Sequence, residues 1–347
     1  MGRKNSYDAI RLFAAVLVVF SHSFALTGNS GPHIGIFGEI GVWIFFILSG
    51  YLISRSWDQY PRFNVFFAKR LLRIVPGLFV ATLATVAVVG VFFTSLPLMS
   101  YLTNQETLNY INNIFIYNPS FTLPGAFAAN PYPNAVNGSI WTLAYEFTMY
   151  LVVALIGIFK LYKKIPPIIL WLGLFGVVLF ITIFGKQPPS HSLFYLDIAQ
   201  MSIFALIFFS GIIMHKYGER IKLDYRLGIL SIALFIGLVL VLPKAAPLFA
   251  ATLLAYGLFS LGKSPVLSWT SRFGDFSYGL YIYAFPVQQM IASITQTDSV
   301  VKMFVASLIV TFVIAVLSWH LVESQALKLK DKINTKKYPL LQSDEAW

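Results

Sequence analysis

Apolar stretches of about 20 residues, the length that an α-helix needs to cross the hydrocarbon core of a bilayer, recur along this chain. Of the 347 residues, 57% are hydrophobic and 11% are charged, whereas soluble domains carry about 25% charged residues. The sequence therefore predicts an all-α integral membrane protein, a bundle of about ten transmembrane helices in one domain over residues 1–347. The expected spans are residues 8–27, 37–54, 76–95, 143–160, 168–185, 194–214, 227–243, 246–262, 276–296 and 302–322.

The distribution of basic residues tests this division independently. If the N-terminus is inside, most of the 25 Lys and Arg residues fall in inner segments, and the long outer loop, residues 96–142, contains none. Since cytoplasmic loops carry an excess of Lys and Arg, we expect both termini in the cytoplasm. Topology and contact with anionic membrane lipids then explain the net charge of +11, and no nucleic-acid partner is needed.

The first expected span contains two ionisable residues, Arg11 and His22, in the segment RLFAAVLVVFSH. Eleven residues at 100° each end about 20° past three full helical turns, so both side chains lie on one stripe, about 16 Å apart. Such residues would be unusual in a cleaved signal peptide, so we expect the span to be retained. An imidazole, with a pKa near 6.5, is suited to act as a general base. The alternative is a core histidine that hydrogen-bonds a neighbouring helix.

Metal and thiol chemistry find no support in the pattern. The chain has no cysteine, and none of His33, His191, His215 and His320 forms a close-spaced pair with His22. We therefore expect no metal site.

Other residues in or near the expected spans are candidates for structural or functional roles. Arg70 and Arg73 are three residues apart, so they share a helix face and can fork onto phosphate oxygens, although basic residues there also satisfy the positive-inside rule. Pro76 is expected near the start of the third span. Glu146, expected in the outer half of the fourth span, needs a partner or a proton and is placed to meet His22. Glu323 is either an ion-pair partner or a site residue.

The motifs in this order resemble those of the acyltransferase-3 family, ten-helix membrane proteins that O-acylate cell-surface glycans and other hydroxyl-bearing acceptors. The resemblance covers essentially the whole chain. It is carried by Arg11 with His22, by GVWIFFILSGY from Gly41, by Arg70 and Arg73 before Pro76, by Trp141, Leu143 and Glu146, and by the segment from Val322 to Lys330.

The resemblance implies transfer of an acyl group, expected to be acetyl, from cytoplasmic acyl-CoA to a hydroxyl of an envelope glycan such as O-antigen. It further implies a multi-pass protein of the bacterial inner membrane. His22 would be the general base, with Arg11 and Glu146 as further catalytic residues, and Arg70 and Arg73 would bind the phosphates of acetyl-CoA. Residues expected near the substrates or the oxyanion are Ser49, Tyr51, Trp141, Tyr281 and Glu323.

Two departures from the family pattern limit this expectation. Many members carry a histidine where this chain has Ala284. Many also append a soluble esterase-like domain, for which this sequence has no room, so the membrane domain or a separate partner would complete the transfer.

Two other functions fit the span pattern. A proton-coupled transporter or a flippase for lipid-linked glycans would suit ten spans with an intramembrane Arg and His, although we find no internal repeat of the kind common in carriers. In a purely structural membrane subunit, Arg11, His22 and Glu146 would be replaceable without loss of activity.

Overall fold

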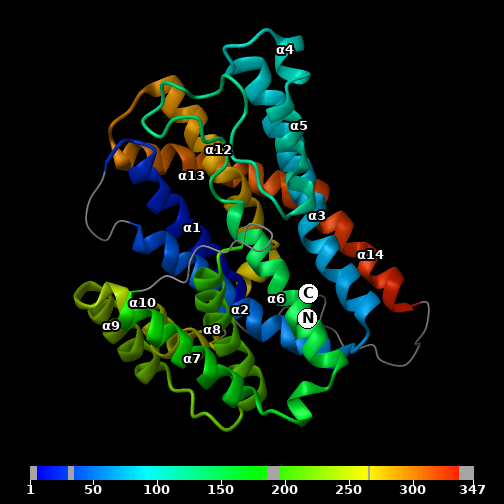
Figure 1. The fold of residues 1–347 in the computed structure, drawn as a ribbon, viewed down its shortest axis with the longest axis vertical. Helices are drawn as coiled ribbons and strands as arrows, with labels where there is room; N and C mark the ends of the chain where they lie inside the picture. The colour runs from blue at the N-terminus through cyan, green and yellow to red at the C-terminus, as the bar shows by residue number, and fades with distance from the viewer. Residues whose placement is uncertain (1–5, 30–34, 186–195, 265, 336–347) are drawn as a thin grey trace.

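The computed structural model describes residues 6–29, 35–185, 196–264 and 266–335, and within these ranges the chain folds into helices without extended strands (Figure 1). A helix lies at each of the ten expected spans. The basic residues Arg3, Lys4, Lys186, Lys336 and Lys337, and the first two residues of the sixth span, lie outside the described residues.

Eight helical segments of the described chain are long and apolar enough to cross a bilayer. They are α1 (Tyr7–Ala25), α2 (Ile36–Gln59), α3 (Phe63–Phe92), α6 (Trp141–Ile158), α7 (Pro167–Phe184), α8 (Ile198–Tyr217), Pro243–Gly262 and Val300–Lys330. The two other expected spans coincide with α9 (Tyr225–Val241), which has only 17 residues, and α12 (Ser277–Thr295). A count of ten spans therefore remains a prediction.

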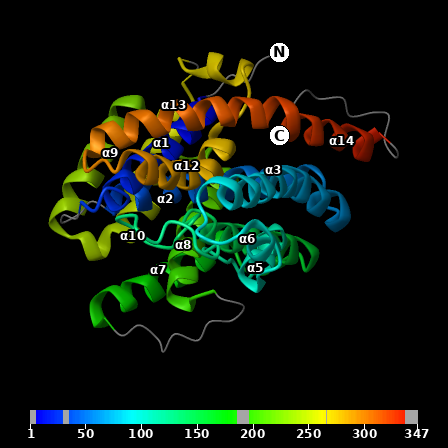
Figure 2. The same ribbon diagram turned by 90° about the horizontal axis from the view of Figure 1, so that it is seen from above.

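The segments after α9 and around α13 are irregular. Pro243–Ala245 forms the 3₁₀ turn η3, followed by α10 (Ala246–Phe249), the π-helical η4 (Ala250–Leu254) and α11 (Ala255–Gly262). After 3₁₀ turn η5 (Ser268–Arg272) and α12, the chain forms α13 (Val300–Ser318), the π-helical η6 (Trp319–Glu323) and α14 (Ser324–Thr335). Figure 2 shows α13 and α14 as one long, nearly continuous rod.

The expected place of Pro76 near the start of a helix is wrong. Helix α3 begins at Phe63, and Pro76 lies inside it rather than near its start. The helix begins directly after Pro61 and the extended residue Arg62. Its first part contains Lys69, Arg70 and Arg73, so hydropathy does not mark it as part of a membrane span. Beside the proline, the hydroxyl of Tyr278 donates to the carbonyl of Ile74 at 2.7 Å.

Small residues bring the central helices into backbone contact. An added Cβ at Gly41 would lie 2.6 Å from the carbonyl oxygen of Ala14, and one at Gly50 would collide with the carbonyl oxygen of Phe208. Since side chains at these positions would force the helices apart, Gly41 and Gly50 serve packing of α2 against α1 and α8.

The order of contacts along paired helices gives their relative directions. Arg11 contacts Asp275, just before α12, and His22 contacts Phe285 within α12, so α1 and α12 run parallel. Helix α2 is antiparallel to α1, since Gly38 lies beside Ser21 and Gly41 beside Ala14. These directions are the ones that an alternation of ten spans requires.

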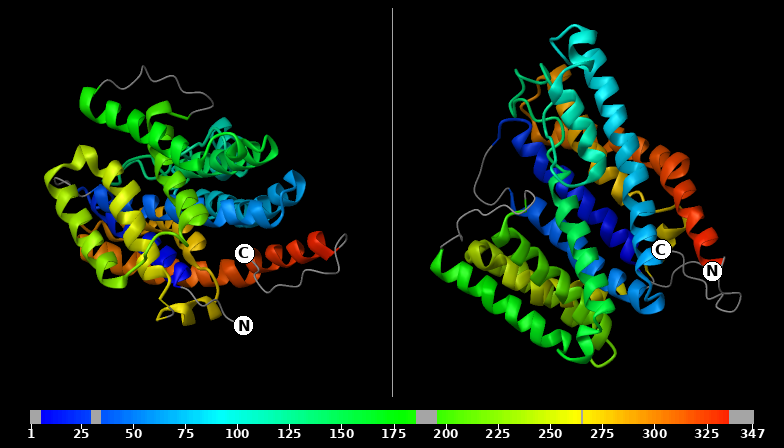
Figure 3. Two further views of the ribbon diagram at one scale, coloured as in Figure 1. Left: turned by 90° about the horizontal axis from the view of Figure 1, so that it is seen from below. Right: turned by 45° about the vertical axis from the view of Figure 1, so that its right-hand side comes forward.

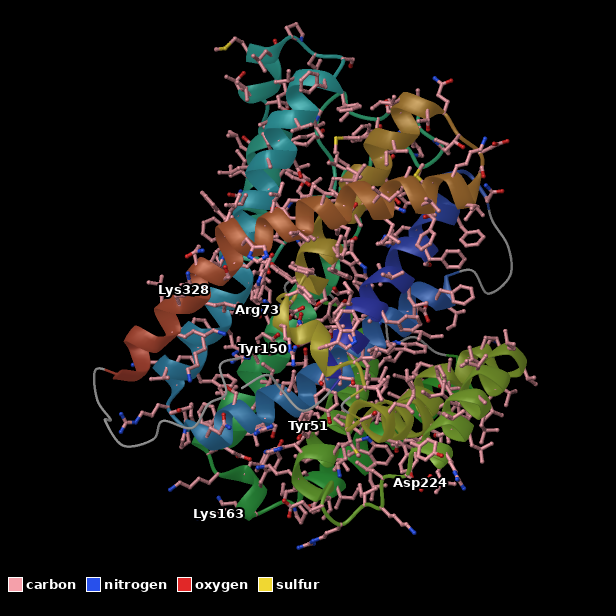
Figure 4. The ribbon with its side chains drawn as sticks, turned by 180° about the vertical axis from the view of Figure 1, so that it is seen from behind. Tyr51, Arg73, Tyr150, Lys163, Asp224 and Lys328 are labelled. Atoms are coloured by element: carbon pink, nitrogen blue, oxygen red, sulfur yellow. The ribbon has the colours of Figure 1, made fainter. Side chains whose placement is uncertain are left out.

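The ends of the bundle agree with that alternation. Lys163, in the 3₁₀ turn η2 (Leu161–Lys163) before α7, and Asp224, before α9, lie at the end of the molecule opposite the loop that follows α3 (Figure 4). Asp224 caps α9 by accepting from the backbone N–H groups of Arg226 and Leu227, and Asp197 caps α8 in the same way.

The long loop between α3 and α6 is partly helical. Helices α4 (Leu98–Leu102) and α5 (Gln105–Ile111), with the 3₁₀ turn η1 (Asn112–Phe115), cap the upper end of α3 in Figure 1. The buried Tyr101 donates its hydroxyl to the carbonyl of Val86 at 2.9 Å.

At the other edge of the molecule, α7 is peripheral (Figure 3), and only Pro167 and Val178 of its residues are buried.

Candidate functional site

Four charged side chains from four segments meet near the N-terminal end of α1. We call Arg11, Arg73, Asp275 and Glu323 the charge cluster. Asp275 Oδ2 lies 2.5 Å from Arg11 Nη1 and 2.5 Å from Arg73 Nη2, and Glu323 Oε2 lies 3.6 Å from Arg73 Nη1. Two guanidiniums therefore face two carboxyl groups in the cluster.

Asp275 is the centre of this cluster. The backbone N–H and the hydroxyl of Ser277 both donate to Asp275 Oδ1. Burial alone raises the pKa of Asp275, but the guanidiniums of Arg11 and Arg73 and the bonds from Ser277 outweigh it and hold that pKa well below its usual range. The carboxylate is therefore charged at neutral pH.

The irregular turn η6 carries Glu323 into the cluster. A π-helical turn inserts an extra residue into an α-helix and changes the direction of the side chains that follow, and such turns are frequent at functional sites. Glu323 is 2% exposed and accepts from the hydroxyl of Ser318 at 3.0 Å. The guanidinium of Arg73 also lies over the rings of Tyr278 and Trp319.

Arg70 is buried but has fewer polar partners than Arg73. Its Nη2 donates to the hydroxyl of Ser56 at 3.2 Å, and its Nε has no hydrogen-bond partner among the described residues. No carboxylate in the described part of the chain lies within ion-pair distance of it. Of the two arginines expected to bind phosphate, Arg70 is therefore the one with unused donor capacity.

Glu146 lies beside these groups rather than beside His22. Its Oε1 accepts from Ser49 at 2.8 Å and from the hydroxyl of Tyr150 at 2.5 Å. Figure 4 shows Tyr150 and Arg73 near one another in the interior. The expected meeting of Glu146 with His22 is not observed, because Glu146 is one helical turn further along α6 than Thr142, which faces α12.

A cavity of about 610 Å³ lies at the other end of α1. We call it the His22 cavity. It is built from the C-terminal end of α1 and the first turns of α2, α6 and α8, and it is lined by His22, Glu39, Trp43, Ser139, Trp141, Gln200, Phe204 and Tyr281, among others. This volume is in the range of small-ligand sites, about 300–1,000 Å³.

His22 lines this cavity without the usual support of a general base. Its ring packs edge-on against Phe285, with ring centres 5.0 Å apart, and its buried Nδ1 has no hydrogen-bond partner among the described residues. Arg11 is bound to Asp275 and does not contact the imidazole. Both residues nevertheless face α12 and the loop before it, as expected for one stripe of a helix.

Trp141 and Tyr281 are the expected substrate residues that the structure brings to His22. The hydroxyl of Tyr281 is hydrogen-bonded to Thr142 Oγ at 2.6 Å, and its ring packs on Phe45. Ser49 and Tyr51 are not among the residues that line the cavity. Tyr51 packs edge-on against His215 and against Tyr7.

Ala284 replaces the histidine that is common at this place in the family pattern. It is 1% exposed and packs in a small cluster with Ala15 and Val19 of α1. The Ala284 methyl group therefore contributes to the packing of α12 against α1.

The sequence reasoning missed Asp275 and Glu39. Asp275 had a sequence signal, since it is an acidic residue two positions before Ser277, where α12 begins. Glu39 lies three residues after the start of α2. An acidic residue there is usually explained by its favourable interaction with the helix dipole, so it gave no signal of a site.

This chain belongs to the acyltransferase-3 family of membrane proteins, since a family model described as an acyltransferase domain matches residues 4–320. The O-acetyl transferase of Shigella phage Sf6 is 29% identical to it over 340 residues, 94% of this chain and 97% of the phage protein. Nodulation protein 10 of Rhizobium leguminosarum bv. viciae is 27% identical over 368 residues, 96% of this chain and 95% of that protein.

A longer relative matches over part of its length. The peptidoglycan O-acetyltransferase OatA of Listeria monocytogenes is 25% identical over 380 residues, which cover 93% of this chain but 56% of OatA. No solved structure matches the chain. Family and relatives together define a multi-pass membrane O-acyltransferase.

Proposed function

We propose that this protein transfers an acetyl group from acetyl-CoA, bound on the side of the charge cluster, to a glycan hydroxyl in the His22 cavity. The observation that carries the proposal is the division of α1, whose Arg11 belongs to the charge cluster and whose His22 lines the cavity. The names of the phage and Listeria relatives support acetyl as the group transferred.

The reaction needs little beyond positioning and a base, because a thioester is already activated. The acceptor oxygen attacks the thioester carbonyl, an O–C bond forms and the C–S bond breaks. His22 takes the hydroxyl proton and returns it to the departing thiolate. The long flexible arm of the donor would span the distance of about 16 Å between Arg11 and His22.

Arg70 is our first choice for the donor phosphates. Its Nε is unpartnered among the described residues, whereas both carboxylates of the charge cluster already face Arg73. A planar guanidinium with free donors is suited to phosphate. In this proposal Arg73, Asp275 and Glu323 hold the surrounding helices, and Arg73 is a positioning residue.

The remaining expected residues have roles on either side of the reacting atoms. Trp141 and Tyr281 would contact the acceptor, since both line the cavity. Glu146 and Ser49 lie on the side of the charge cluster, where they would border the donor arm. With both termini cytoplasmic, as the charge pattern predicts, the cavity opens outward from a bacterial inner membrane toward envelope glycans such as O-antigen.

The test is the O-acetyl content of envelope glycan in cells that carry native protein or the His22→Ala variant. We expect transfer to fall at least about 100-fold with normal protein levels, because general-base catalysis contributes about 10²–10⁴-fold. His320→Ala, at an exposed histidine outside the cavity, is the matched control and should retain activity. Unchanged acetylation in His22→Ala would refute the catalytic assignment.

A second measurement separates the enzyme from a carrier. Purified protein supplied with acetyl-CoA and acceptor should release free CoA, and the His22→Ala variant should not. A transporter or flippase releases none.

A further inference from the structure

The His22 cavity contains a second titratable side chain, Glu39, that the proposed reaction does not use. Gly38 packs directly against Ser21, so the first turn of α2 lies beside the turn of α1 that carries His22. The Glu39 side chain is exposed and lines the cavity.

The other polar groups of the cavity are almost all uncharged. Asn29, Ser139 and Gln200 supply amide and hydroxyl groups, and the described residues that line the cavity include no Lys or Arg. The Ser139 hydroxyl is buried without a hydrogen-bond partner among the described residues, as is His22 Nδ1. Buried polar atoms without partners cost free energy unless a ligand or water completes them, so these two atoms point to a ligand with hydroxyl groups.

Trp141 adds a flat apolar surface. Its side chain is 36% exposed although it packs against Phe204 and Tyr145 within the bundle. An exposed indole face beside neutral hydrogen-bonding groups suits a ring with one apolar face and several hydroxyls at its edge.

We propose that the His22 cavity selects an uncharged sugar, with Glu39 as the residue that excludes acidic ones. This inference rests on the proposed function for the identity of the cavity as the acceptor site. Sugar hydroxyls donate to a carboxylate and to amide oxygens, whereas a sugar carboxylate or phosphate would face Glu39 without a cation to offset the repulsion.

Two probes of equal size test the selection: a neutral hexose tetrasaccharide, and the same tetrasaccharide with one hexose replaced by the corresponding hexuronic acid. Their Kd values are measured on full-length purified protein without donor. We expect native protein to bind the neutral probe at least about tenfold more tightly, a difference of about 1.4 kcal/mol. Glu39→Gln should reduce the preference to about twofold, and Glu39→Asp should keep it.

The matched control is Glu106→Gln, which removes an exposed carboxylate from α5, outside the cavity, and should keep the native preference. Equal binding of both probes by native protein, tighter binding of the acidic probe, or no binding of either would overturn the inference. So would an unchanged preference in a folded Glu39→Gln variant.

Transfer from acetyl-CoA to the same probes separates this inference from the proposed function. Selective binding of the neutral probe without any acetylation would refute the acetyltransfer and leave the selection standing. Equal acetylation of both probes would refute the selection alone.

Discussion

The charge cluster and the His22 cavity lie near opposite ends of α1 and differ in how completely their polar groups are paired. In the cluster, Asp275 contacts two guanidiniums and a hydroxyl, and Glu323 Oε1 accepts from Ser318. Glu323 Oε2 lies 3.6 Å from Arg73 Nη1 and has no hydrogen-bond partner among the described residues. In the cavity, His22 Nδ1 and Ser139 Oγ have no partner among the described residues. Every charged group of the cluster has an ion-pair partner, which holds the helices together, whereas the two neutral unpartnered atoms of the cavity are available to a ligand.

The largest expected effect comes from breaking the ion pairs of the charge cluster. Asp275→Asn leaves Arg11 and Arg73 with Glu323 as their only carboxylate in the cluster, and breaking a buried ion pair typically costs about 3–5 kcal/mol. We therefore expect a clear fall in unfolding temperature, measured on protein purified in detergent. Asp298→Asn, at an exposed carboxylate outside the cluster, should change it little. Equal effects of the two variants would show that the cluster is not a stabilising network.

The pH dependence gives the same region a second test. Because the pKa of Asp275 is lowered in the folded protein, its contribution to stability is fully present above its unfolded pKa, about 3.9. That contribution is lost as the pH falls through the lower folded value. The difference in unfolding temperature between native protein and Asp275→Asn should thus shrink as the pH falls below about 4. A difference that stays constant or grows below that pH would contradict the assignment.

Arg70 and Arg73 sharpen the comparison, because among the described residues only Arg73 has carboxylate partners. Arg70→Gln should raise the KM for acetyl-CoA about tenfold or more, equivalent to at least about 1.4 kcal/mol of binding, with little loss of stability. Arg73→Gln should instead lower the unfolding temperature, since it deprives Asp275 and Glu323 of a cation. The measurements are steady-state kinetics over a range of donor concentrations, and thermal unfolding of both variants. The opposite pattern would exchange the roles of the two residues.

Sequence patterns predicted the helices well because lipid imposes simple rules of length and charge on a membrane span. The position of α1 followed from the length of its apolar stretch, and the common stripe of Arg11 and His22 followed from helical periodicity. The start of α3 was missed because its first turns carry Lys69 and Arg70, which hydropathy excludes from a span. These side chains are buried by protein, a fact that depends on tertiary packing.

The partners of the site residues were harder to predict than their positions on helices. Glu146 was expected at His22, but its depth in the bundle did not reveal which face it presents. That face meets Ser49 and Tyr150. Asp275 was missed because it lies in a connection more than 260 residues from Arg11, where periodicity gives no information about contacts.

The smallest expected effect concerns the boundary between the two regions. Thr142 and Tyr281 are hydrogen-bonded at 2.6 Å, and Tyr281 lines the cavity while Glu146 lies one turn below Thr142. Thr142→Val should lower the free energy of unfolding by about 1 kcal/mol, the net worth of one hydrogen bond. Thr182→Val, which removes only a bond from Thr182 to the carbonyl of Val178 within α7, should stay within about 0.5 kcal/mol.

A double-mutant cycle makes this last prediction specific to the pair. If the hydroxyl of Tyr281 is held by Thr142, then Tyr281→Phe should cost about 1 kcal/mol in native protein and much less in the Thr142→Val background. Additive effects would mean that the hydrogen bond contributes nothing measurable, and that Tyr281 is held by its packing on Phe45. A coupling of the expected size would instead show that the hydrogen bond from Thr142 holds Tyr281 at the boundary between the charge cluster and the His22 cavity.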